Sequence, residues 1–333
     1  MKHLLVIFLL GSIAFLPTRQ AGAKAQETYN RTLKLMGSRF DITVIANSKV
    51  QANTYIDLAV GEIQRIERLI SSWDPNSQTS AINQNAGIKA VVVDPELLQL
   101  IQRSIGLSKL TDGAFDISYA SMDRIWQFDG SMTQMPAPDI ISASVAKVGY
   151  GKIDINVTQR SVYLKEAGMK IGFGAIGKGY AADKAKALLI AEGVEGGIIN
   201  ASGDMNTWGT QSNGEDWMIA ITNPMDKSKS YGLLPIKKGA VVTSGNYEKF
   251  VSFDGKRYAH IIDPRTGYPA KGIISVTVFA PKAELADALA TSIFVMGIDA
   301  GINRINQMAE IECIIIDDIG GIHHSNQIKI KPQ

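Results

Sequence analysis

The chain has 333 residues, of which 45% are hydrophobic and 20% charged, with 31 Gly and 11 Pro. This length and apolar fraction suffice for a large hydrophobic core, and they exclude low-complexity disorder and collagen-like repetition. The formal net charge of +2 comes without a basic block. Nucleic acid is therefore not expected as the main partner, because phosphate neutralisation requires clustered Lys and Arg.

The first 25 residues have the pattern of a secretory signal peptide. Lys2 precedes an apolar run from Leu4 to Leu16, and small residues lead to a predicted cleavage after Ala25. The run of about 13 residues is shorter than the roughly 20 of a membrane helix, although a retained anchor is the alternative. Cleavage removes three basic residues and no acid, so residues 26–333 would form one mature domain with 31 basic and 32 acidic residues. We expect an exported protein, periplasmic or on the outer face of the inner membrane.

The order of the remaining elements predicts an α+β fold with mixed or antiparallel sheets and packed helices, in a single intertwined body. The predicted helices lie at 49–70, 95–110, 178–191, 282–296 and 299–308. The predicted strands lie at 39–46, 152–157, 161–165, 196–200, 216–222, 231–236, 240–243, 248–253, 258–262, 273–280 and 311–317. Asp94 and Pro95 form a typical start for the second helix, as N-cap and first helical residue. Strands in runs, with helices between the runs, indicate α+β rather than an alternating parallel sheet.

One cysteine and four histidines limit the metal chemistry. Cys313 lies in the apolar segment IECIIID, which favours a buried structural thiol. His3 belongs to the signal segment, and His323 and His324 lie near the C-terminus, so His260 is the only histidine in the body of the chain. Zinc sites built from His and Cys are therefore excluded, and any metal must be held by oxygen ligands.

A glycine-rich segment precedes the third predicted helix. Residues 172–177 read GFGAIG, a literal match to the dinucleotide fingerprint, and residues 172–179 miss the phosphate-loop pattern only because Gly179 replaces a Ser or Thr. Neither motif fits its context, because the segment lies mid-chain among antiparallel strands and lacks the hydroxyl that binds magnesium. Glycines before a helix N-terminus still allow an anion to approach the backbone, and Lys178 adds a cation. We interpret the segment as a site for a phosphate-bearing ligand, with tight strand–helix packing as the alternative.

Asp287 and Thr291 lie four residues apart in the predicted helix at 282–296, so they share a helical face. Their neighbours Leu285, Ala288 and Leu289 are apolar, which is not typical of a solvated surface. One carboxylate with neutral oxygens suits Mg²⁺, whose remaining ligands are substrate phosphates and water. The alternative is a surface Asp beside a Thr that bonds to its own backbone.

The segment HIIDPRTG places His260 on a predicted strand, three residues before a turn. Such a histidine can accept a proton near neutral pH, with Asp263 or Arg265 orienting the loop; a half-buried structural histidine is the alternative. Trp73, before an Asp-Pro turn, and Phe115, in TDGAFD, are candidate flat walls for an isoalloxazine or adenine ring. Core packing is the alternative for both aromatic side chains.

Taken together, these segments resemble the ApbE family of FAD:protein FMN transferases over roughly residues 30–320. The matching stretches are LMGSRFDITV, SSWDPNSQTSAIN, TDGAFDIS, FGAIGKGYAAD, TSGNYEKF, HIIDPRTGYP and SVTVFAP followed by ADALAT. The resemblance implies a T-fold-like architecture and an enzyme that uses Mg²⁺ to transfer the FMN moiety of FAD to a threonine hydroxyl of an acceptor flavoprotein, releasing AMP. Implied acceptors are subunits of Na⁺-pumping NADH:quinone reductase or Rnf-type complexes, or other extracytoplasmic FMN-binding domains. The alternatives are an FAD pyrophosphatase that yields FMN and AMP, and a non-catalytic periplasmic flavin-binding protein.

The resemblance also implies roles for individual positions. Expected FAD contacts are Met36, Trp73, Ala114, Phe115, Asp116, Lys178 and Ile261. Expected magnesium ligands are Ala175, through its carbonyl, Asp287 and Thr291, and His260 matches the base that deprotonates the acceptor threonine. Gly172 and Ala290 depart from the family pattern, because other members often have Asp at the first position and some have a second acid at the other; the cysteine that carries the lipid in many members is also lacking. A metal site with fewer charges is therefore expected.

Overall fold

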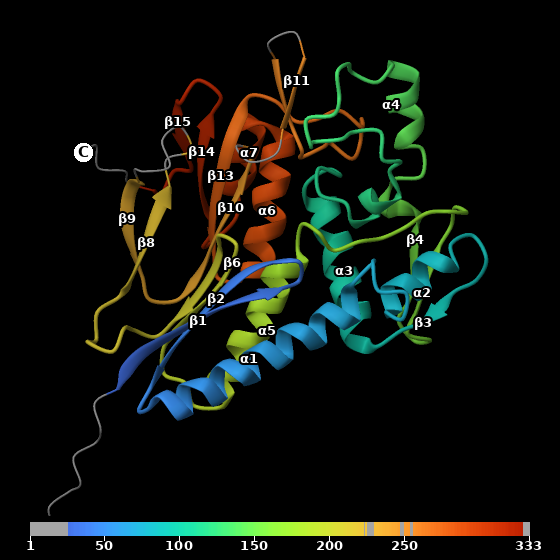
Figure 1. Cartoon of the computed structure of the whole chain (residues 1–333). Helices are drawn as coiled ribbons and strands as arrows, with labels where there is room; N and C mark the ends of the chain where they lie inside the picture. The colour runs from blue at the N-terminus through green and yellow to red at the C-terminus, as the bar shows by residue number, and fades with distance from the viewer. Residues whose placement is uncertain (1–25, 223, 225–229, 247–249, 254–255, 329–333) are drawn as a thin grey trace, which may run out of the picture.

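A computed structural model describes residues 26–222, 224, 230–246, 250–253 and 256–328, so the predicted signal segment lies outside the described residues. An eight-stranded sheet dominates it, in the order β1-β2-β6-β7-β10-β13-β14-β15 (Figure 1). Every neighbouring pair in this sheet is antiparallel. The strands are β1 (Glu27–Leu35), β2 (Ser38–Ala46), β6 (Gly197–Ala201), β7 (Asp204–Trp208), β10 (Gly239–Gly245), β13 (Ile273–Ala280), β14 (Glu312–Asp317) and β15 (Ile322–His324).

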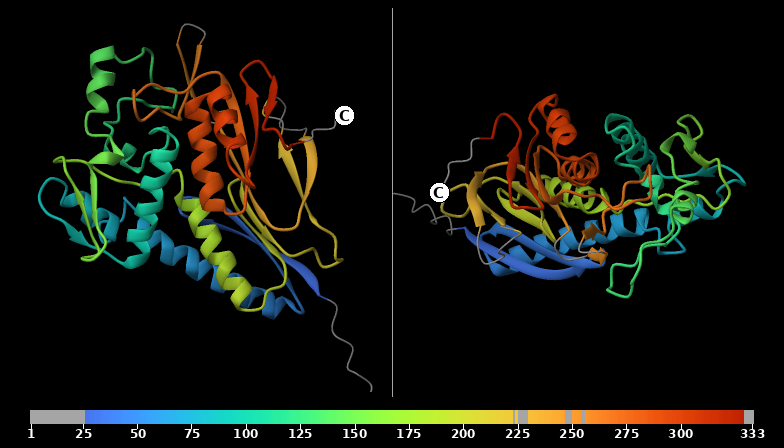
Figure 2. Two further views of the ribbon diagram at one scale, coloured as in Figure 1. Left: turned by 180° about the vertical axis from the view of Figure 1, so that it is seen from behind. Right: turned by 90° about the horizontal axis from the view of Figure 1, so that it is seen from above.

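Helices pack against this sheet and form a second layer (Figures 1 and 2). They are α1 (Lys49–Ile70) against β2, α5 (Gly177–Ala191) against β7, and α6 (Ala283–Met296) against β10 and β13; α7 (Ile298–Asn306) follows α6 and packs on β14. Alternate strand residues such as Phe40, Ile42 and Val44 are buried, as expected for strands with one face on a core. The two layers thus enclose one main hydrophobic core.

The remaining elements lie on the side of α3 (Pro95–Leu110), seen to the right in Figure 1. Most of them extend this core, whereas Ile141 packs in a second, smaller cluster. They include α2 (Gln78–Gln84), α4 (Pro138–Ser144), the short helices η1 (Ile117–Ser121) and η2 (Tyr150–Lys152), and a three-stranded sheet of β3 (Val91–Val92), β5 (Ser161–Leu164) and β4 (Ile153–Asn156). Two hairpins complete the fold, β8 (Trp217–Thr222) with β9 (Ser230–Ile236) and β11 (Phe250–Phe253) with β12 (Lys256–Ala259). The predicted α+β class with antiparallel sheets is confirmed.

Helix signals in the sequence agree closely with the structure. Ser48 caps α1 by accepting a hydrogen bond from the Gln51 N–H at 3.2 Å, and α1 buries apolar residues at helical spacing. Asp94 caps α3 by accepting from the Glu96 N–H at 2.7 Å, with Pro95 at the first helical position. Both helices have the predicted bounds, because caps and apolar spacing act locally.

Strand signals were less complete. The predicted list lacks the short strands β3 and β15. It also lacks β1, an edge strand on which few side chains are buried, and β7, which buries the polar residues Asp204 and Asn206. Polar residues on the inward face hide the apolar alternation by which a strand is recognised. The placement of His260 on a strand is wrong, because β12 ends at Ala259 and His260 begins the following loop. Residues 248 and 249 of one predicted strand lie outside the described residues.

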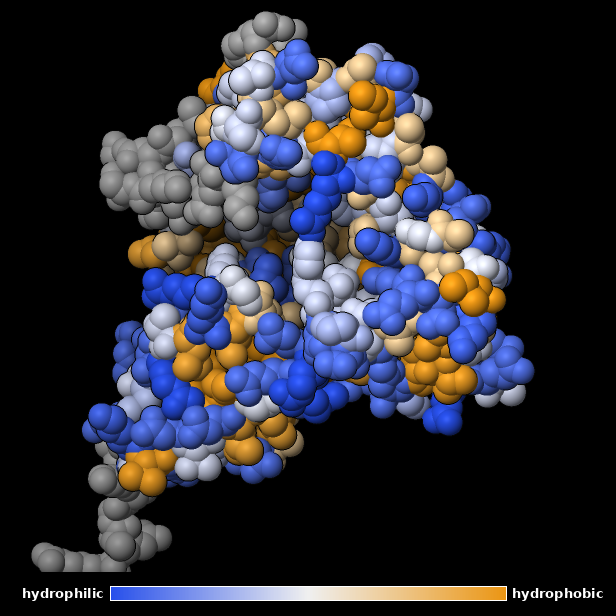
Figure 3. All heavy atoms as spheres, turned by 45° about the vertical axis from the view of Figure 1, so that its right-hand side comes forward, coloured by the Kyte–Doolittle hydropathy of each residue, from blue (hydrophilic) through white to orange (hydrophobic). Residues whose placement is uncertain are grey.

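The exterior of the molecule is mixed in character. Figure 3 shows small apolar patches separated by polar and charged side chains on the face turned to the viewer. Within the part of the chain that the structure describes, helices with the length and apolar character of a bilayer span are absent.

Replacing Ile56 with Ala should lower the free energy of unfolding by about 2–5 kcal/mol, because the substitution leaves a cavity between α1 and the sheet. Ile56 is 1% exposed, whereas Leu58 on the same helix is 36% exposed. Leu58→Ala is therefore the matched control, with an expected change within about 0.5 kcal/mol. Urea unfolding measures both variants, and equal effects would contradict the assigned face of α1.

Candidate active site

The first turns of α5 and α6 make close contact in the middle of the molecule (Figure 1). A Cβ atom at Gly179 would lie 2.2 Å from the carbonyl oxygen of Ala283, so a side chain cannot be accommodated there. The Gly179 N–H donates a hydrogen bond to Oδ2 of Asp287 at 3.2 Å. The close approach of the two helices thus explains why Gly179 stands where the phosphate-loop pattern has a Ser or Thr. The same contact brings the glycine-rich segment next to Asp287, a predicted metal ligand.

A group of charges, in which the two acids are buried and Lys178 is partly exposed, lies at this contact. The Lys178 ammonium group pairs with the carboxylate of Asp204, which is 3% exposed, and Asp287 is 4% exposed. Burial opposes the charge on Lys178, but the carboxylates of Asp287 and Asp204 outweigh it and raise the lysine pKa. Burial raises the pKa of Asp204 to about 7; repulsion by Asp287 adds to this effect and Lys178 opposes it. Two buried acids beside a partly exposed lysine, with the pKa values of Lys178 and Asp204 shifted, are typical of a functional site.

Asp204 was missed by the sequence analysis. It is the first residue of β7, directly after a tight turn in which Ser202 and Gly203 both have positive φ. An acid after a glycine turn is usually exposed, so the sequence carries no local signal for its burial. Only the pairing of β6 with β7, under the start of α5, brings this carboxylate to Lys178.

Oxygen donors suitable for a hard cation lie near this group. Thr291, one helical turn after Asp287, has its Oγ1 3.3 Å from Oγ of Ser244 on β10. Ala175, whose carbonyl is a predicted ligand, lies in the turn that directly precedes α5. One carboxylate, hydroxyls and a carbonyl fit Mg²⁺, which binds few protein ligands and keeps water or substrate phosphates. Among the residues that the structure describes, no three His, Cys, Asp or Glu side chains form a metal-binding group, so the magnesium assignment stays a prediction.

Two positions at which the family resemblance leads us to expect acids, Gly172 and Ala290, are closely packed here. A Cβ at Gly172 would lie 3.1 Å from the Ala120 Cβ and 3.6 Å from the Ser72 Oγ. Ala290 is fully enclosed on α6. An acid at position 172 would require Ala120 to move, so the glycine is matched to its surroundings in this chain.

The predicted flavin contacts differ in their environments. Met36 occupies the β1–β2 turn with φ +49°, and its Cε would lie 3.8 Å from a Cβ at Gly177, beside the start of α5. Trp73 is 77% exposed, with the Arg124 guanidinium carbon 4.8 Å from a ring centroid. Its exposure contradicts the core-packing alternative and leaves the ring available for stacking on a ligand.

The Ala114–Asp116 segment is buried instead of open. Phe115 packs in the main core, which agrees with core packing, the alternative to a flavin contact for this side chain. Asp116 accepts hydrogen bonds from Ser118 and from the Tyr150 N–H at 2.7 Å, and burial raises its pKa despite these bonds. These side chains shape the local backbone, so any contact with a ligand here would involve backbone atoms.

The loop after β12 is tied down at several points. The His260 ring packs edge-on against Phe128, with ring centroids 6.4 Å apart and planes at 78°. The exposed Arg265 donates to both carboxylate oxygens of Asp263 at 2.8 Å, and Trp126 donates to the Gly267 carbonyl at 2.9 Å. Ile261 is buried and accepts a hydrogen bond from the Ala270 N–H at 2.9 Å. This bracing holds His260 at the start of a fixed loop, as a positioned base requires.

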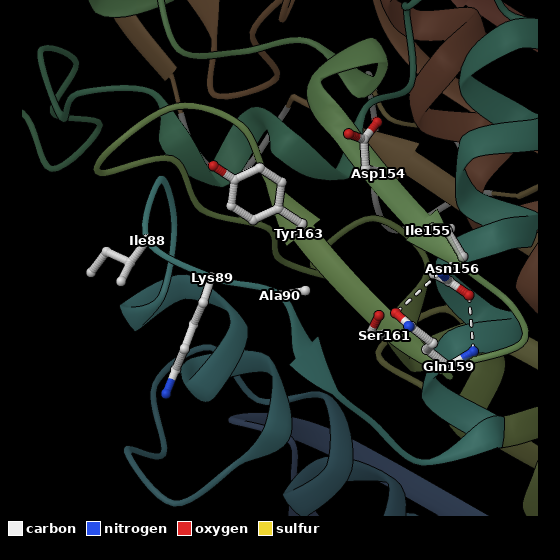
Figure 4. A pocket seen from close by; sticks show the side chains of 9 residues that line it. All are labelled: Ile88, Lys89, Ala90, Asp154, Ile155, Asn156, Gln159, Ser161 and Tyr163. Carbon is white, nitrogen blue, oxygen red and sulfur yellow. Dashed lines mark hydrogen bonds between the residues drawn. The ribbon is translucent and has the colours of Figure 1, made fainter.

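A hollow of about 510 Å³ lies elsewhere, on the three-stranded sheet (Figure 4). Its lining includes Lys89, Asp154 and Tyr163, and Asn156 and Gln159 are hydrogen-bonded to each other at its rim. None of the predicted site residues lines this hollow. The candidate active site is therefore assigned from the buried charges at α5 and α6.

The chain is similar in sequence to proteins of known function. The sequence model of the ApbE family matches residues 36–315. A Klebsiella pneumoniae protein named FAD:protein FMN transferase is 32% identical, over 86% of this chain and 89% of its own length. A Treponema pallidum protein of the same name is 30% identical, over 76% and 74% respectively.

Solved structures agree in fold. The crystal structure of the ApbE protein from Thermotoga maritima superposes with a TM-score of 0.81 at 30% identity, covering 90% of this chain and 97% of the other. The flavin transferase ApbE from Vibrio cholerae gives a TM-score of 0.80 at 25% identity, covering 90% and 98%.

Gly179→Ala should lower the free energy of unfolding by about 1–3 kcal/mol, because its methyl group meets the backbone of α6. Helix propensity alone favours Ala over Gly by about 1 kcal/mol, so without the steric contact the variant would be more stable than wild type. A destabilised variant therefore shows that the contact is present. Gly174→Ala is the control, because a Cβ there has no atom within 4 Å. Urea unfolding compares the two, and a stabilised Gly179→Ala variant would show that the helices do not touch as described.

Asp204 should give stability a characteristic pH dependence. Its pKa is about 7 in the folded protein against an ordinary 3.8, so the folded state binds the proton more tightly between these values. The free energy of unfolding therefore falls as pH rises through this window, by the linkage relation. In the Asp204→Asn variant, the free energy of unfolding measured with urea should fall less steeply over this pH range. Asp299→Asn, at an exposed position, is the control and should follow wild type. Parallel profiles for wild type and Asp204→Asn would refute the raised pKa.

Proposed function

The chain belongs to the ApbE family, and we propose that it transfers the FMN moiety of FAD to a threonine hydroxyl of an acceptor flavoprotein, with Mg²⁺ as cofactor and AMP as product. Flavin transfer as the enzymatic activity is supported by the relatives named FAD:protein FMN transferase. The observation that carries the finer proposal is the pairing of the partly exposed Lys178 with the buried Asp204, beside the buried Asp287, where α5 and α6 begin.

This group suits a diphosphate bound together with a divalent cation. Helix N-termini favour anions, and Lys178 adds a positive charge at the start of α5. The two carboxylates alone would repel a diphosphate, so a cation is needed between Asp287 and the substrate. The pyrophosphate of FAD therefore fits this position better than an uncharged ligand would.

Asp287, Thr291 and the carbonyl of Ala175 would hold Mg²⁺. Bound there, Mg²⁺ would neutralise charge on the diphosphate oxygens and on the departing AMP. Lys178 would bind the diphosphate, and Asp204 would hold the lysine in place. The exposed ring of Trp73 offers a flat surface to the isoalloxazine ring of the flavin.

The transfer step requires a nucleophile and a base. The threonine Oγ of the acceptor would attack the FMN-side phosphorus, forming a new P–O bond as the bond from this phosphorus to the bridging oxygen breaks. The bridging oxygen leaves with AMP, and the hydroxyl proton passes to His260. The hydrogen bonds of Asp263, Arg265 and Trp126 would keep this histidine's loop in place.

We further propose that the reaction takes place outside the cytoplasm, in the periplasm or on the outer face of the inner membrane. The signal-like pattern of residues 1–25 supports this placement. The proposed acceptors are subunits of Na⁺-pumping NADH:quinone reductase or Rnf-type complexes, or other extracytoplasmic FMN-binding domains.

Incubating the protein with FAD, Mg²⁺ and an FMN-accepting domain should produce a fluorescent acceptor band in a gel and a mass gain of one FMN. Free FMN and AMP without labelling would instead indicate a pyrophosphatase, and FAD that stays intact would indicate a flavin-binding protein. An acceptor domain with its threonine changed to Val controls for non-covalent flavin.

Asp287→Ala should reduce the transfer rate by about 100-fold or more, because a metal ligand supports several kcal/mol of charge stabilisation. His260→Ala should reduce it by about 10²- to 10⁴-fold, the usual contribution of a general base. Asp299→Ala, which removes an acid at an exposed position, is the control and should transfer FMN at the wild-type rate. Rates follow from the time course of acceptor fluorescence, and undiminished transfer by Asp287→Ala would remove the metal assignment.

A further inference from the structure

The start of α6 lacks a capping side chain of its own. Its N-cap residue is Lys282, an exposed residue with extended backbone (φ −128°, ψ 139°) and without a side-chain hydrogen bond to the helix. The first N–H groups of a helix have no partner within the helix, so another group must satisfy them. In this molecule the partner comes from a different helix.

Asp183, in the middle of α5, supplies that partner. Its Oδ1 accepts from the Ala283 N–H at 3.0 Å, and its Oδ2 accepts from the Glu284 N–H at 2.9 Å. Both carboxylate oxygens are therefore used on the first two residues of α6. A carboxylate at this place also interacts favourably with the helix dipole.

The same carboxylate is anchored to the sheet. Nδ2 of Asn206 on β7 donates to Oδ1 of Asp183 at 2.6 Å. The ammonium group of Lys186, one turn along α5, donates to Oδ1 of Asn206 and to the Thr207 carbonyl, both at 2.8 Å. Asn206 and Lys186 are buried, so this network is shielded from water and geometrically specific.

The network lies beside the proposed reaction site. Asp183 follows Gly179 by one turn of α5, and Gly179 donates to Asp287. Asp287 in turn follows Glu284 by about one turn of α6. The cap and the Gly179–Asp287 hydrogen bond are therefore two ties between the same helices, and only the second involves a proposed ligand.

We infer that Asp183 is a positioning residue, which caps α6 from α5 and so fixes Asp287 and Thr291 relative to Lys178. Its effect on catalysis rests on the proposed function, whereas its effect on the helix contact does not. Asp183 itself is not assigned any contact with substrate or metal.

The alternative is that Asp183 only stabilises α6 as a cap, and a second-site variant separates the two roles. Asp183→Ala should lower Tm by about 2–4 °C, as expected for the loss of a cap in a chain of this size. Adding Lys282→Asp gives α6 a cap of its own, which should restore Tm without restoring the tie to α5. Lys282→Asp alone is the control for that substitution.

Two measurements on the double variant decide the inference. Hydrogen exchange at the Gly179 amide should be at least about tenfold faster than in wild type, although Tm is restored. The Mg²⁺ concentration for half-maximal transfer should rise about 10- to 100-fold, as for loss of a group that orients a metal ligand. Wild-type exchange at Gly179 would overturn the inference and leave Asp183 as a cap only.

The exchange measurement does not depend on transfer. If wild type transfers no FMN with Mg²⁺, the proposed function fails while Gly179 exchange still tests the helix tie. If wild type transfers FMN and the double variant has faster exchange but the wild-type Mg²⁺ requirement, the claim that Asp183 positions the ligands is overturned. The proposed function is then unaffected.

Discussion

The close contact between the first turns of α5 and α6 is the constraint on which the candidate site depends. It is possible only because position 179 has no side chain, since a Cβ there would meet the Ala283 backbone at 2.2 Å. The contact places a backbone N–H against Asp287 and sets the carboxylate beside Lys178. Two helix N-termini thereby lie beside three charged groups, of which Asp204 and Asp287 are buried and Lys178 is partly exposed.

Burying these charges is unfavourable unless each is compensated. Lys178 and Asp204 form a direct pair, which leaves Asp287 with a backbone donor and the more distant field of the lysine. The group thus holds more negative than positive charge, because two carboxylates share one ammonium ion. A bound cation would compensate the excess negative charge, and a diphosphate could then bind to the cation. This charge compensation links the fold to the proposed chemistry.

The strand β7 connects this site to the rest of the sheet. Its inward positions carry Asp204 and Asn206 instead of apolar residues, and each bonds to α5, one at Lys178 and one at Asp183 and Lys186. These polar contacts hold α5 in one orientation on the sheet, whereas an apolar strand would allow it to slide. The features that made β7 difficult to recognise in the sequence are therefore the ones that position the site.

The sequence by itself determined the five longer helices, the fold class, the family resemblance and the list of candidate residues, whereas the seven-residue helices α2 and α4 were missed. The cap at Asp94 and the pair Asp287–Thr291 depend on neighbours within about one turn, so their spacing is visible in the chain. Tertiary structure alone decided the burial of Asp204, the capping of α6 by Asp183, the exposure of Trp73 and the placement of His260 beyond β12. Each of these depends on strand pairing or helix contact between segments far apart in sequence, for which local spacing gives no signal.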